Sequence, residues 1–160
     1  MSIRAFRMED LPVITDIANR AWKTIKIMSR DALGDEISDL CNPEGDSVTK
    51  GRQIEQCAAQ TPENIFVCER NGKIVGFITF YLEDNLIGTI NNNASDPDCG
   101  EKGVGQEMYQ AVFEHFKSKG MKAAKVTTGL DYAHAPARKA YLRAGFDHEL
   151  RSVTYYRTLD

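Results

Sequence analysis

The sequence lacks any long apolar run. A transmembrane helix needs roughly 18 consecutive apolar residues, and no stretch of this chain approaches that length. Residues 1–13 carry charges where a secretion signal requires an apolar core. We therefore expect neither a membrane span nor a secretion signal, and we expect the protein to be cytoplasmic.

The spacing of the cysteines carries no metal-site pattern. The four cysteines form no CxxC pair, and no histidine stands near them at the spacing of zinc ligands. We expect no metal site and free thiols in a reducing compartment. The cysteines are Cys41, Cys57, Cys68 and Cys99.

An excess of positive charge is also absent. Lys and Arg number 20 against 23 Asp and Glu, which gives a formal net charge of −3. A chain with this balance has no global field that attracts nucleic acid or anionic lipid. Its aromatic residues do not interleave with basic ones, as they do in many nucleic-acid-binding segments. We therefore expect no nucleic-acid partner and no membrane partner.

What is present fits one globular domain. The chain has 160 residues, of which 42% are hydrophobic and 27% are charged, and this is the size and balance of a single folded unit with its own core. No repeat, low-complexity tract or linker divides the sequence. We expect a single domain over residues 1–160.

The first part of the chain is predicted to be mainly helical after a short opening strand. Residues 2–7 alternate in polarity as a strand does. Apolar residues then recur at helical spacing through Ile25, after acidic residues that suit a helix N-terminus. Two further helices are expected over residues 29–40 and 51–58.

From Asn64 the pattern changes to β-prone runs. Asn71-Gly72 separates two of these runs and is the strongest short hairpin signal. A longer helix closed by Gly120 and a short helix closed by Gly145 follow, each ended by the glycine that a C-cap favours. Strands are expected over residues 64–70, 73–82, 86–94, 122–128 and 149–159.

A glycine-rich loop precedes the longer of these helices. Its glycines leave backbone N–H groups unhindered, and Lys102 adds a positive charge, so the loop suits a phosphate at a helix N-terminus. Gln106 and the residue after it exclude a nucleotide P-loop, and Met108 stands where a dinucleotide fingerprint needs glycine. The loop glycines are Gly100, Gly103 and Gly105.

Two segments together resemble the GNAT superfamily of N-acyltransferases. Residues 96–105 look like its acyl-CoA loop, in which Gln or Arg, two residues, Gly, one residue, and Gly or Ala follow one another. Residues 134–146 resemble its second motif, with Asn, Ala, Tyr and a closing Gly-Phe at fixed spacing. The opening strand and helix and the order of the elements match as well, so the resemblance covers essentially the whole chain.

This resemblance implies an α/β (α+β) fold with a mixed, mostly antiparallel sheet of six to seven strands, flanked by about four helices. The fourth and fifth strands, here residues 86–94 and 122–128, would splay apart around the pantetheine arm of acetyl-CoA, the implied cosubstrate. The implied cofactor-binding residues are Asn93, Ala94, Ser95, Gly100, Glu101, Lys102, Gly103, Val104, Gly105, Gln106, His134 and Tyr141.

Tyr141 matches the family tyrosine that protonates the leaving thiolate, a step that needs a hydrogen donor. The alternative is a packing tyrosine four residues after Ala137. His134 stands where the family has Asn, and it would contact the cofactor, cap the following helix or face solvent.

The sequence assigns no general base. Residues 87–93 contain no carboxylate where some family members place a glutamate. Asn91 or Asn92 could position a water, Asp131 or Glu83 could take the proton, or the proton could pass through water to bulk solvent.

The function implied by the resemblance is an acetyl-CoA-dependent N-acetyltransferase, in which a primary amine of a small molecule or peptide attacks the thioester directly in a ternary complex. The acceptor would bind over Trp22, Ile25 and Met28. The alternative is a non-catalytic acyl-CoA-binding sensor or interaction module, kept open by the missing glutamate and by Gly100, which replaces the family's Gln or Arg. We expect a monomer or homodimer, with the last strand offering an edge for pairing.

Overall fold

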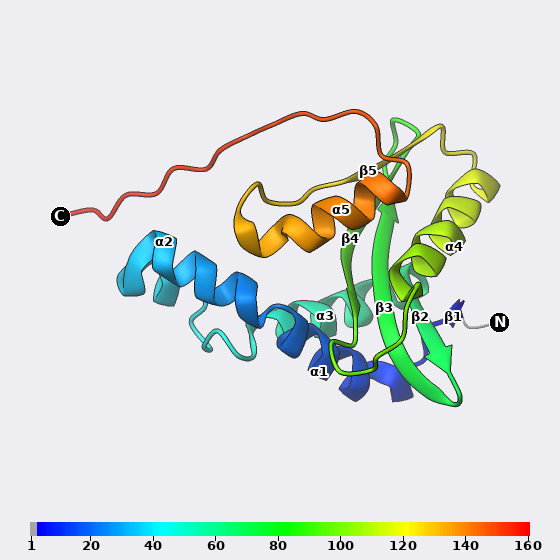
Figure 1. The fold of residues 1–160 in the computed structure, drawn as a ribbon, viewed down its shortest axis with the longest axis horizontal. Coiled ribbons are helices and arrows are strands. Elements are labelled where there is room, and N and C mark those ends of the chain that lie inside the picture. Colours follow the sequence, from blue (N-terminus) through cyan, green and yellow to red (C-terminus); the bar gives the residue numbers. More distant parts are fainter. Residues whose placement is uncertain (1–2) are drawn as a thin grey trace.

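The computed structural model describes residues 3–160 and contains, within them, one sheet of five strands. The strands lie in the order β1-β2-β3-β4-β5 and are antiparallel except for the parallel pair β4–β5. The sheet is therefore mixed and mostly antiparallel, as predicted, but it has five strands instead of six or seven. Its strands are β1 (Ile3–Ala5), β2 (Ile65–Arg70), β3 (Lys73–Leu82), β4 (Ile87–Ser95) and β5 (Ala123–Val126) (Figure 1).

Within the described residues the sheet is accompanied by five α-helices, where about four were expected, and by short 3₁₀ turns. In the same part of the chain, no helix has both the length and the apolar character needed to cross a membrane. The helices are α1 (Leu11–Ala21), α2 (Lys23–Cys41), α3 (Thr49–Gln60), α4 (Val104–Ser118) and α5 (Ala135–Arg143), and the 3₁₀ turns are η1 (Met8–Asp10), η2 (Pro62–Asn64) and η3 (Tyr132–His134).

The hairpin between β2 and β3 forms where the sequence predicts it. Asn71 and Gly72 have φ angles of 50° and 76°, which are the left-handed values that a two-residue type I′ turn requires. The turn sets the pairing of Arg70 with Lys73 at the start of the ladder. The predicted hairpin is therefore confirmed.

Helices cover both faces of the sheet. Successive residues of a strand point to opposite faces, so the neighbours Phe77 and Ile78 of β3, both fully buried, belong to two different core clusters. On the Phe77 face, α1 and α3 bury Ile14, Ile17, Ala18, Ile54 and Ala58. On the Ile78 face, α4 buries Val104, Met108, Tyr109, Val112 and Phe116.

The first long helix is shorter than its apolar stripe predicts. It ends at Ala21, and Trp22, with φ −87° and ψ 0°, separates it from α2. The second helix begins at Lys23 instead of residue 29 and bends at Gly34, whose φ is 78°. The apolar stripe wrongly extends the first helix to Ile25, because this residue faces the cavity described below and not the core.

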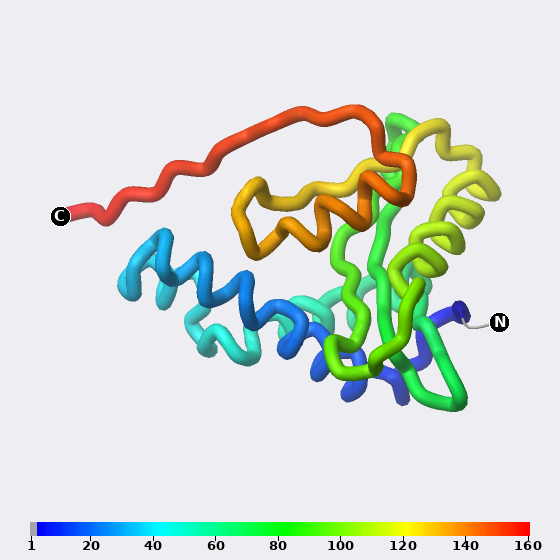
Figure 2. The backbone as a smooth tube through the Cα atoms, in the orientation of Figure 1, coloured from blue at the N-terminus to red at the C-terminus, as the bar shows by residue number. Residues whose placement is uncertain are grey.

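The predicted last strand over residues 149–159 is absent, and this prediction is wrong for the single chain. Residues 147–160 have no regular element in the structure, and Leu150 and Tyr155 are 98% and 89% exposed. Figures 1 and 2 show this segment leaving the body of the molecule beyond α5. A strand needs a hydrogen-bonded neighbour, and no neighbour for this segment exists among residues 3–160 of the same chain.

Candidate functional site

The parallel pairing of β4 with β5 stops halfway along β4. The ladder runs from Ile87 opposite Ala123 to Ile90 opposite Val126 and ends there. Beyond this point the two chains separate, and residues 91–95 and 127–128 both line a cavity of about 650 Å³. The splay expected between the fourth and fifth strands is thus present. It exposes backbone and side chains that a regular sheet would cover.

A β-bulge accompanies this opening. The register between β3 and β4 shifts between Ile78 and Phe80, and the backbone N–H of Asn92 donates to the Thr79 hydroxyl at 2.9 Å instead of to a ladder carbonyl. A bulge bends its strand and increases the local twist. The second half of β4 is therefore turned away from the line of β5.

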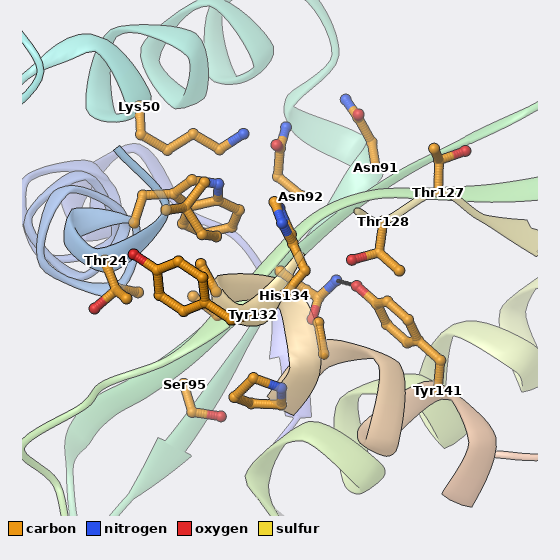
Figure 3. Close-up of a pocket in the computed structure, with 18 residues that line it drawn as sticks. Thr24, Lys50, Asn91, Asn92, Ser95, Thr127, Thr128, Tyr132, His134 and Tyr141 are labelled. Atoms are coloured by element: carbon orange, nitrogen blue, oxygen red, sulfur yellow. Dashed lines mark hydrogen bonds between the residues drawn. The ribbon is translucent and has the colours of Figure 1, made fainter. Parts of the chain in front are cut away.

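The side chains around the cavity come from five parts of the chain (Figure 3). The junction of α1 and α2 and the start of α3 form one end, and β4, the segment after β5 and α5 form the other. The lining residues are Ala21, Trp22, Thr24, Ile25, Lys50, Asn91, Asn92, Asn93, Ala94, Ser95, Thr127, Thr128, Tyr132, Ala133, His134, Pro136, Ala137 and Tyr141.

Tyr141 belongs to a chain of hydrogen bonds that crosses from β4 to the helices. The Asn93 Nδ2 donates to the Tyr141 hydroxyl oxygen at 3.0 Å, and the Tyr109 hydroxyl donates to Asn93 Oδ1 at 2.8 Å. Burial raises the pKa of both tyrosine hydroxyls, while the bond from Asn93 acts in the opposite direction on Tyr141. Since Tyr141 accepts from Asn93, its own O–H hydrogen is free to point elsewhere.

His134 is fixed by an acidic partner. The Asp131 carboxylate accepts from the backbone N–H of His134 at 3.0 Å and lies 2.8 Å from its Nδ1. Burial opposes ionisation of Asp131, but hydrogen bonds from His134 hold the pKa of its carboxyl below the usual value. With Nδ1 held in this way, Nε2 is the ring nitrogen left for a ligand, and His134 lines the cavity.

Gly129 is required beside this pair. A Cβ built on Gly129 would lie 2.4 Å from Asp131 Oδ2 and 2.5 Å from His134 Nδ1. Arg138 ties the same loop down by donating to the carbonyl oxygens of Gly129 and Asp131 at 2.7 and 2.6 Å. The loop therefore presents His134 in a defined orientation.

The glycine-rich loop leads from β4 into α4. Gly103, with φ 80°, precedes the helix, and the first helical bond runs from the Glu107 N–H to the Gly103 carbonyl. The N–H groups of Val104, Gly105 and Gln106 therefore lack partners within the helix. Together with the positive end of the helix dipole they form an anion-binding arrangement.

Two contacts hold this loop in place. Arg20 of α1 bonds to both Asp96 and Asp98 at 2.7 Å, which fastens the start of the loop to the helical layer. The Gln106 side chain donates to the Ala140 carbonyl of α5 at 3.0 Å. Gln106 therefore offers a ligand its backbone N–H, because its side-chain amide is already engaged.

The far end of the cavity carries a lysine that the sequence did not single out. The Lys50 Nζ lies 4.3 Å from the centroid of the Trp22 ring and donates to Gln53 at 3.1 Å. Burial, and then the nearby charge of Lys26, lower the pKa of Lys50 to about 8. None of the residues that line the cavity is an aspartate or a glutamate.

Seven of the fifteen residues predicted for the site line this one cavity, and eight do not. Met28 and the loop residues 100–106 lie outside its lining. Glu83, considered as a base, is bonded to Thr89 and Lys125 at 2.9 and 2.8 Å and does not line the cavity. The predicted residues that do line it are Trp22, Ile25, Asn93, Ala94, Ser95, His134 and Tyr141.

Sequence reasoning missed several of the polar residues at the site. It used Asn93 only for its backbone, although its side chain joins two tyrosines. Lys50 stands in a short, polar helix where a solvated lysine is the ordinary expectation. No local signal separates these positions from surface ones. Thr24, Thr127, Thr128 and Tyr132 also line the cavity and were not predicted.

Comparison with known proteins shows which family the chain matches. Over residues 33–146 it matches the model of the acetyltransferase (GNAT) family. It is 28% identical over 93 residues to an uncharacterized N-acetyltransferase of Methanocaldococcus jannaschii, covering 54% of this chain and 40% of that protein. It is 27% identical over 94 residues to a mycothiol acetyltransferase of Thermomonospora curvata, covering 59% of this chain and 31% of that protein. The match thus spans less than half the length of these curated relatives.

A solved structure agrees over nearly the full length. The PaiA N-acetyltransferase of Thermoplasma acidophilum, in complex with coenzyme A, superposes with a TM-score of 0.67 at 17% identity, covering 92% of this chain and 89% of that one. At this identity the likeness concerns the fold. The family match, which spans most of the chain, decides the assignment: the chain belongs to the acetyltransferase (GNAT) family.

Proposed function

We propose that this protein is an N-acetyltransferase that transfers the acetyl group of acetyl-CoA to a primary amine of a small molecule or peptide. One observation carries the proposal. A half-buried tyrosine hydroxyl at the splayed strands, that of Tyr141, accepts a hydrogen bond from Asn93 and keeps its own hydrogen for a ligand. A protein that only bound an acyl-CoA would have no need of a hydrogen donor oriented in this way.

The residues around the cleft suit the cosubstrate. The unpaired N–H groups at the start of α4, a helix of 15 residues, suit a pyrophosphate. Lys102 adds positive charge beside these N–H groups. Gly100 has a φ of 68° and no atom within 4 Å of a built Cβ, so it leaves room for the pyrophosphate. The separated backbones of residues 93–95 and 127–128 offer amide partners to a pantetheine arm. When bound, acetyl-CoA supplies the activated acetyl thioester.

Tyr141 acts as the hydrogen donor for the departing thiolate. Its raised pKa keeps the hydroxyl protonated at neutral pH. Asn93 fixes the direction of that hydroxyl, because Tyr109 occupies the Asn93 carbonyl oxygen and leaves the amide N–H₂ facing Tyr141. His134, with Nδ1 held by Asp131, presents Nε2 to the cosubstrate. General acid catalysis of this kind contributes roughly 10²- to 10⁴-fold to a rate.

The acceptor end favours an amine that also carries an anionic group. Lys50 is a partly buried cation in a cavity whose lining contains no carboxylate. A buried charge without a counter-ion is costly, and an acceptor carboxylate or phosphate would supply that counter-ion. Polycationic amines would meet only repulsion there. Trp22, under the Lys50 ammonium, gives the acceptor an aromatic surface.

The proton of the acceptor amine leaves through water. Asn91 and Asn92 line the cavity and offer amide groups that hold a water. No carboxylate of the cavity lining is present to take the proton directly. The reaction therefore proceeds faster as the acceptor amine becomes neutral in solution, with the pH dependence of that amine.

The test is a calorimetric titration with acetyl-CoA followed by an assay of free thiol released in the presence of anionic, neutral and cationic primary amines. Binding together with amine-dependent thiol release in the wild type, and unchanged binding with much slower release in Tyr141→Phe, would support the proposal. Binding without release from any amine would favour the sensor. Absence of binding would refute the assignment of the α4 loop to the cosubstrate.

A further inference from the structure

The helix that carries Tyr141, α5, is poorly buried. None of its residues is buried, and Leu142 is 68% exposed, whereas α1, α3 and α4 each bury at least three residues. It rests on the α4 side of the core through the partly buried Ala140 and Tyr141. Because packing of an apolar face is what usually holds a helix, α5 depends more than those three helices on polar contacts.

One such contact is made by Gln106. Its Nε2 donates to the carbonyl oxygen of Ala140 at 3.0 Å, across 34 positions of the chain. The same oxygen accepts the backbone N–H of Ala144 at 3.0 Å, and a carbonyl oxygen has two lone pairs for two such donors. The bond from Gln106 therefore adds to the helical bonds of α5 without replacing one. It holds the backbone at the residue directly before Tyr141.

The first turn of α4 contacts α5 in two ways. Tyr109 follows Gln106 by three residues and so lies on the same side of the helix. Its ring centroid is 5.6 Å from that of Tyr141. Gln106 thus contacts the backbone of α5, and Tyr109 contacts its tyrosine ring. The same turn offers the N–H groups that suit a pyrophosphate, so the phosphate site and Tyr141 share one support.

We propose that Gln106 is a positioning residue for Tyr141, whose side-chain amide fixes α5 against the first turn of α4 and so sets the distance of the Tyr141 hydroxyl from a cosubstrate bound at that turn. The inference rests on the proposed function, because it takes Tyr141 as the hydrogen donor. Asn93 sets the direction of the hydroxyl, and Gln106 sets the place of the backbone that carries it. Small misplacements matter in such a site, since a shift of about 1 Å can cost roughly 100-fold in rate.

Two other roles of Gln106 make different predictions. A side chain that bound the cosubstrate directly would affect acetyl-CoA affinity, but the amide is already engaged with Ala140. A side chain that only stabilised the fold would affect the free energy of unfolding and leave kcat unchanged. A positioning role affects kcat and acts through Tyr141.

The first test compares Gln106→Met with Gln110→Met. Both remove a glutamine amide from α4 and keep a side chain of similar length, but the exposed Gln110 donates to Glu114 on its own helix. At saturating acetyl-CoA, Gln106→Met should lower kcat by about tenfold, the cost of a shift smaller than 1 Å. Its acetyl-CoA affinity in calorimetry should stay near that of the wild type, because the backbone N–H remains. Gln110→Met should leave kcat and affinity unchanged.

Gln106→Lys tests whether the hydrogen bond matters. Its ammonium keeps an N–H donor on a side chain of similar length, so it should recover most of the kcat that Gln106→Met loses. In a Tyr141→Phe background, Gln106→Met should cause little further loss, because coupled residues are not additive. A loss of the same size in that background would overturn the proposal. So would a loss confined to acetyl-CoA affinity or to the free energy of unfolding.

A readout without catalysis is the side-chain amide resonance of Asn93 in NMR spectra, assigned by its loss in Asn93→Asp. Because this amide donates to Tyr141, a displacement of α5 should move the resonance in Gln106→Met and not in Gln110→Met. An unmoved resonance in Gln106→Met would overturn the proposal. A wild type that releases no thiol would refute the proposed function, and the NMR comparison would still decide whether Gln106 places α5.

Discussion

The amide nitrogen of Asn93 donates a hydrogen bond of 3.0 Å to the phenol oxygen of Tyr141, although the two residues lie 48 positions apart in the chain. Asn93 cannot turn its amide around without losing the bond that Tyr109 donates to its carbonyl oxygen at 2.8 Å. The strand therefore orients the helix tyrosine, and the direction of one hydroxyl hydrogen depends on three side chains from three elements.

Tyr141→Phe should lower kcat by about 100-fold, the smaller end of what general acid catalysis contributes, with little change in acetyl-CoA affinity. The ring and its packing remain, and only the hydrogen donor is lost. Steady-state kinetics and calorimetry measure the two effects separately. Tyr132→Phe is the matched control, because Tyr132 also lines the cavity but is 64% exposed. Equal losses in both variants would contradict the role of Tyr141.

Asn93→Asp should lower kcat nearly as much as Tyr141→Phe, without a comparable loss of stability. A carboxylate has the shape of the amide but only accepts hydrogen bonds, so the Tyr141 hydrogen would turn toward it and away from the cavity. Combining both substitutions should add little further loss, since coupled residues are not additive. Additive losses in the double variant would show that Asn93 acts independently of Tyr141.

Lys50→Met should lower kcat/KM for acceptors that carry a carboxylate by about tenfold at pH 7, which corresponds to one charge-assisted hydrogen bond. Because the pKa of Lys50 is lowered to about 8, by burial and by Lys26 with Cys57 acting in the opposite sense, the ammonium is lost as the pH rises through 8. The advantage of wild type over Lys50→Met should therefore shrink above pH 8.

Lys50→Arg distinguishes charge from shape in this experiment. The guanidinium stays charged far above pH 8. The kcat/KM of Lys50→Arg for these acceptors should therefore stay above that of Lys50→Met at pH values where the wild type loses its advantage. Measuring kcat/KM against pH for the three proteins decides the point, since the titration of the acceptor amine is common to all. Parallel profiles for wild type and Lys50→Met would refute a charge-dependent role.

Gly129→Ala should weaken acetyl-CoA binding by about tenfold, the scale of one lost hydrogen bond to a charged group. The new methyl group would stand 2.4 Å from the Asp131 carboxylate and 2.5 Å from His134 Nδ1, so the pair must separate. His134→Ala should give a similar loss in calorimetric titrations. Unchanged affinity in both variants would remove His134 from the cosubstrate site.

Gly88→Ala should destabilise the fold by about 1–3 kcal/mol, as overpacking of a core does. A Cβ on Gly88 would lie 2.4 Å from the ring of Phe116, which is buried at 3% exposure. Urea unfolding measures the loss. Adding Phe116→Leu should recover part of the lost stability, because the smaller side chain makes room for the new methyl group. A double variant whose loss of unfolding free energy exceeds the sum of the losses in the two single variants would argue against this contact.

Local features of the fold could be predicted from the sequence because their causes are local. Asn71-Gly72 adopts the backbone angles that its residue types allow, and Gly120 and Gly145, with φ angles of 81° and 98°, end their helices as predicted. The end of α1 at Ala21 could not be predicted, because Ile25 continues the apolar stripe although it lines the cavity and not the core. Hydrophobic periodicity indicates that a residue is shielded from bulk water, but it does not distinguish a core position from a cavity wall.

The C-terminal segment also shows that local sequence does not determine every element. Its composition predicts a strand over residues 149–159, and no strand forms there in the single chain. Whether a strand forms depends on a neighbour that supplies hydrogen bonds, and that neighbour is not encoded in the segment itself.

The sequence by itself determined the local elements of the candidate site and predicted its residues: a glycine loop before a helix start, and Tyr141 on the short helix that follows β5. Only the tertiary structure decided how the site is arranged. The bonds of Asn93 to Tyr141 and Tyr109, the placement of Lys50 on Trp22, and a cavity lining without carboxylates all depend on strand register and helix packing. Contacts between residues distant in sequence are set by the whole fold, and no local pattern carries them.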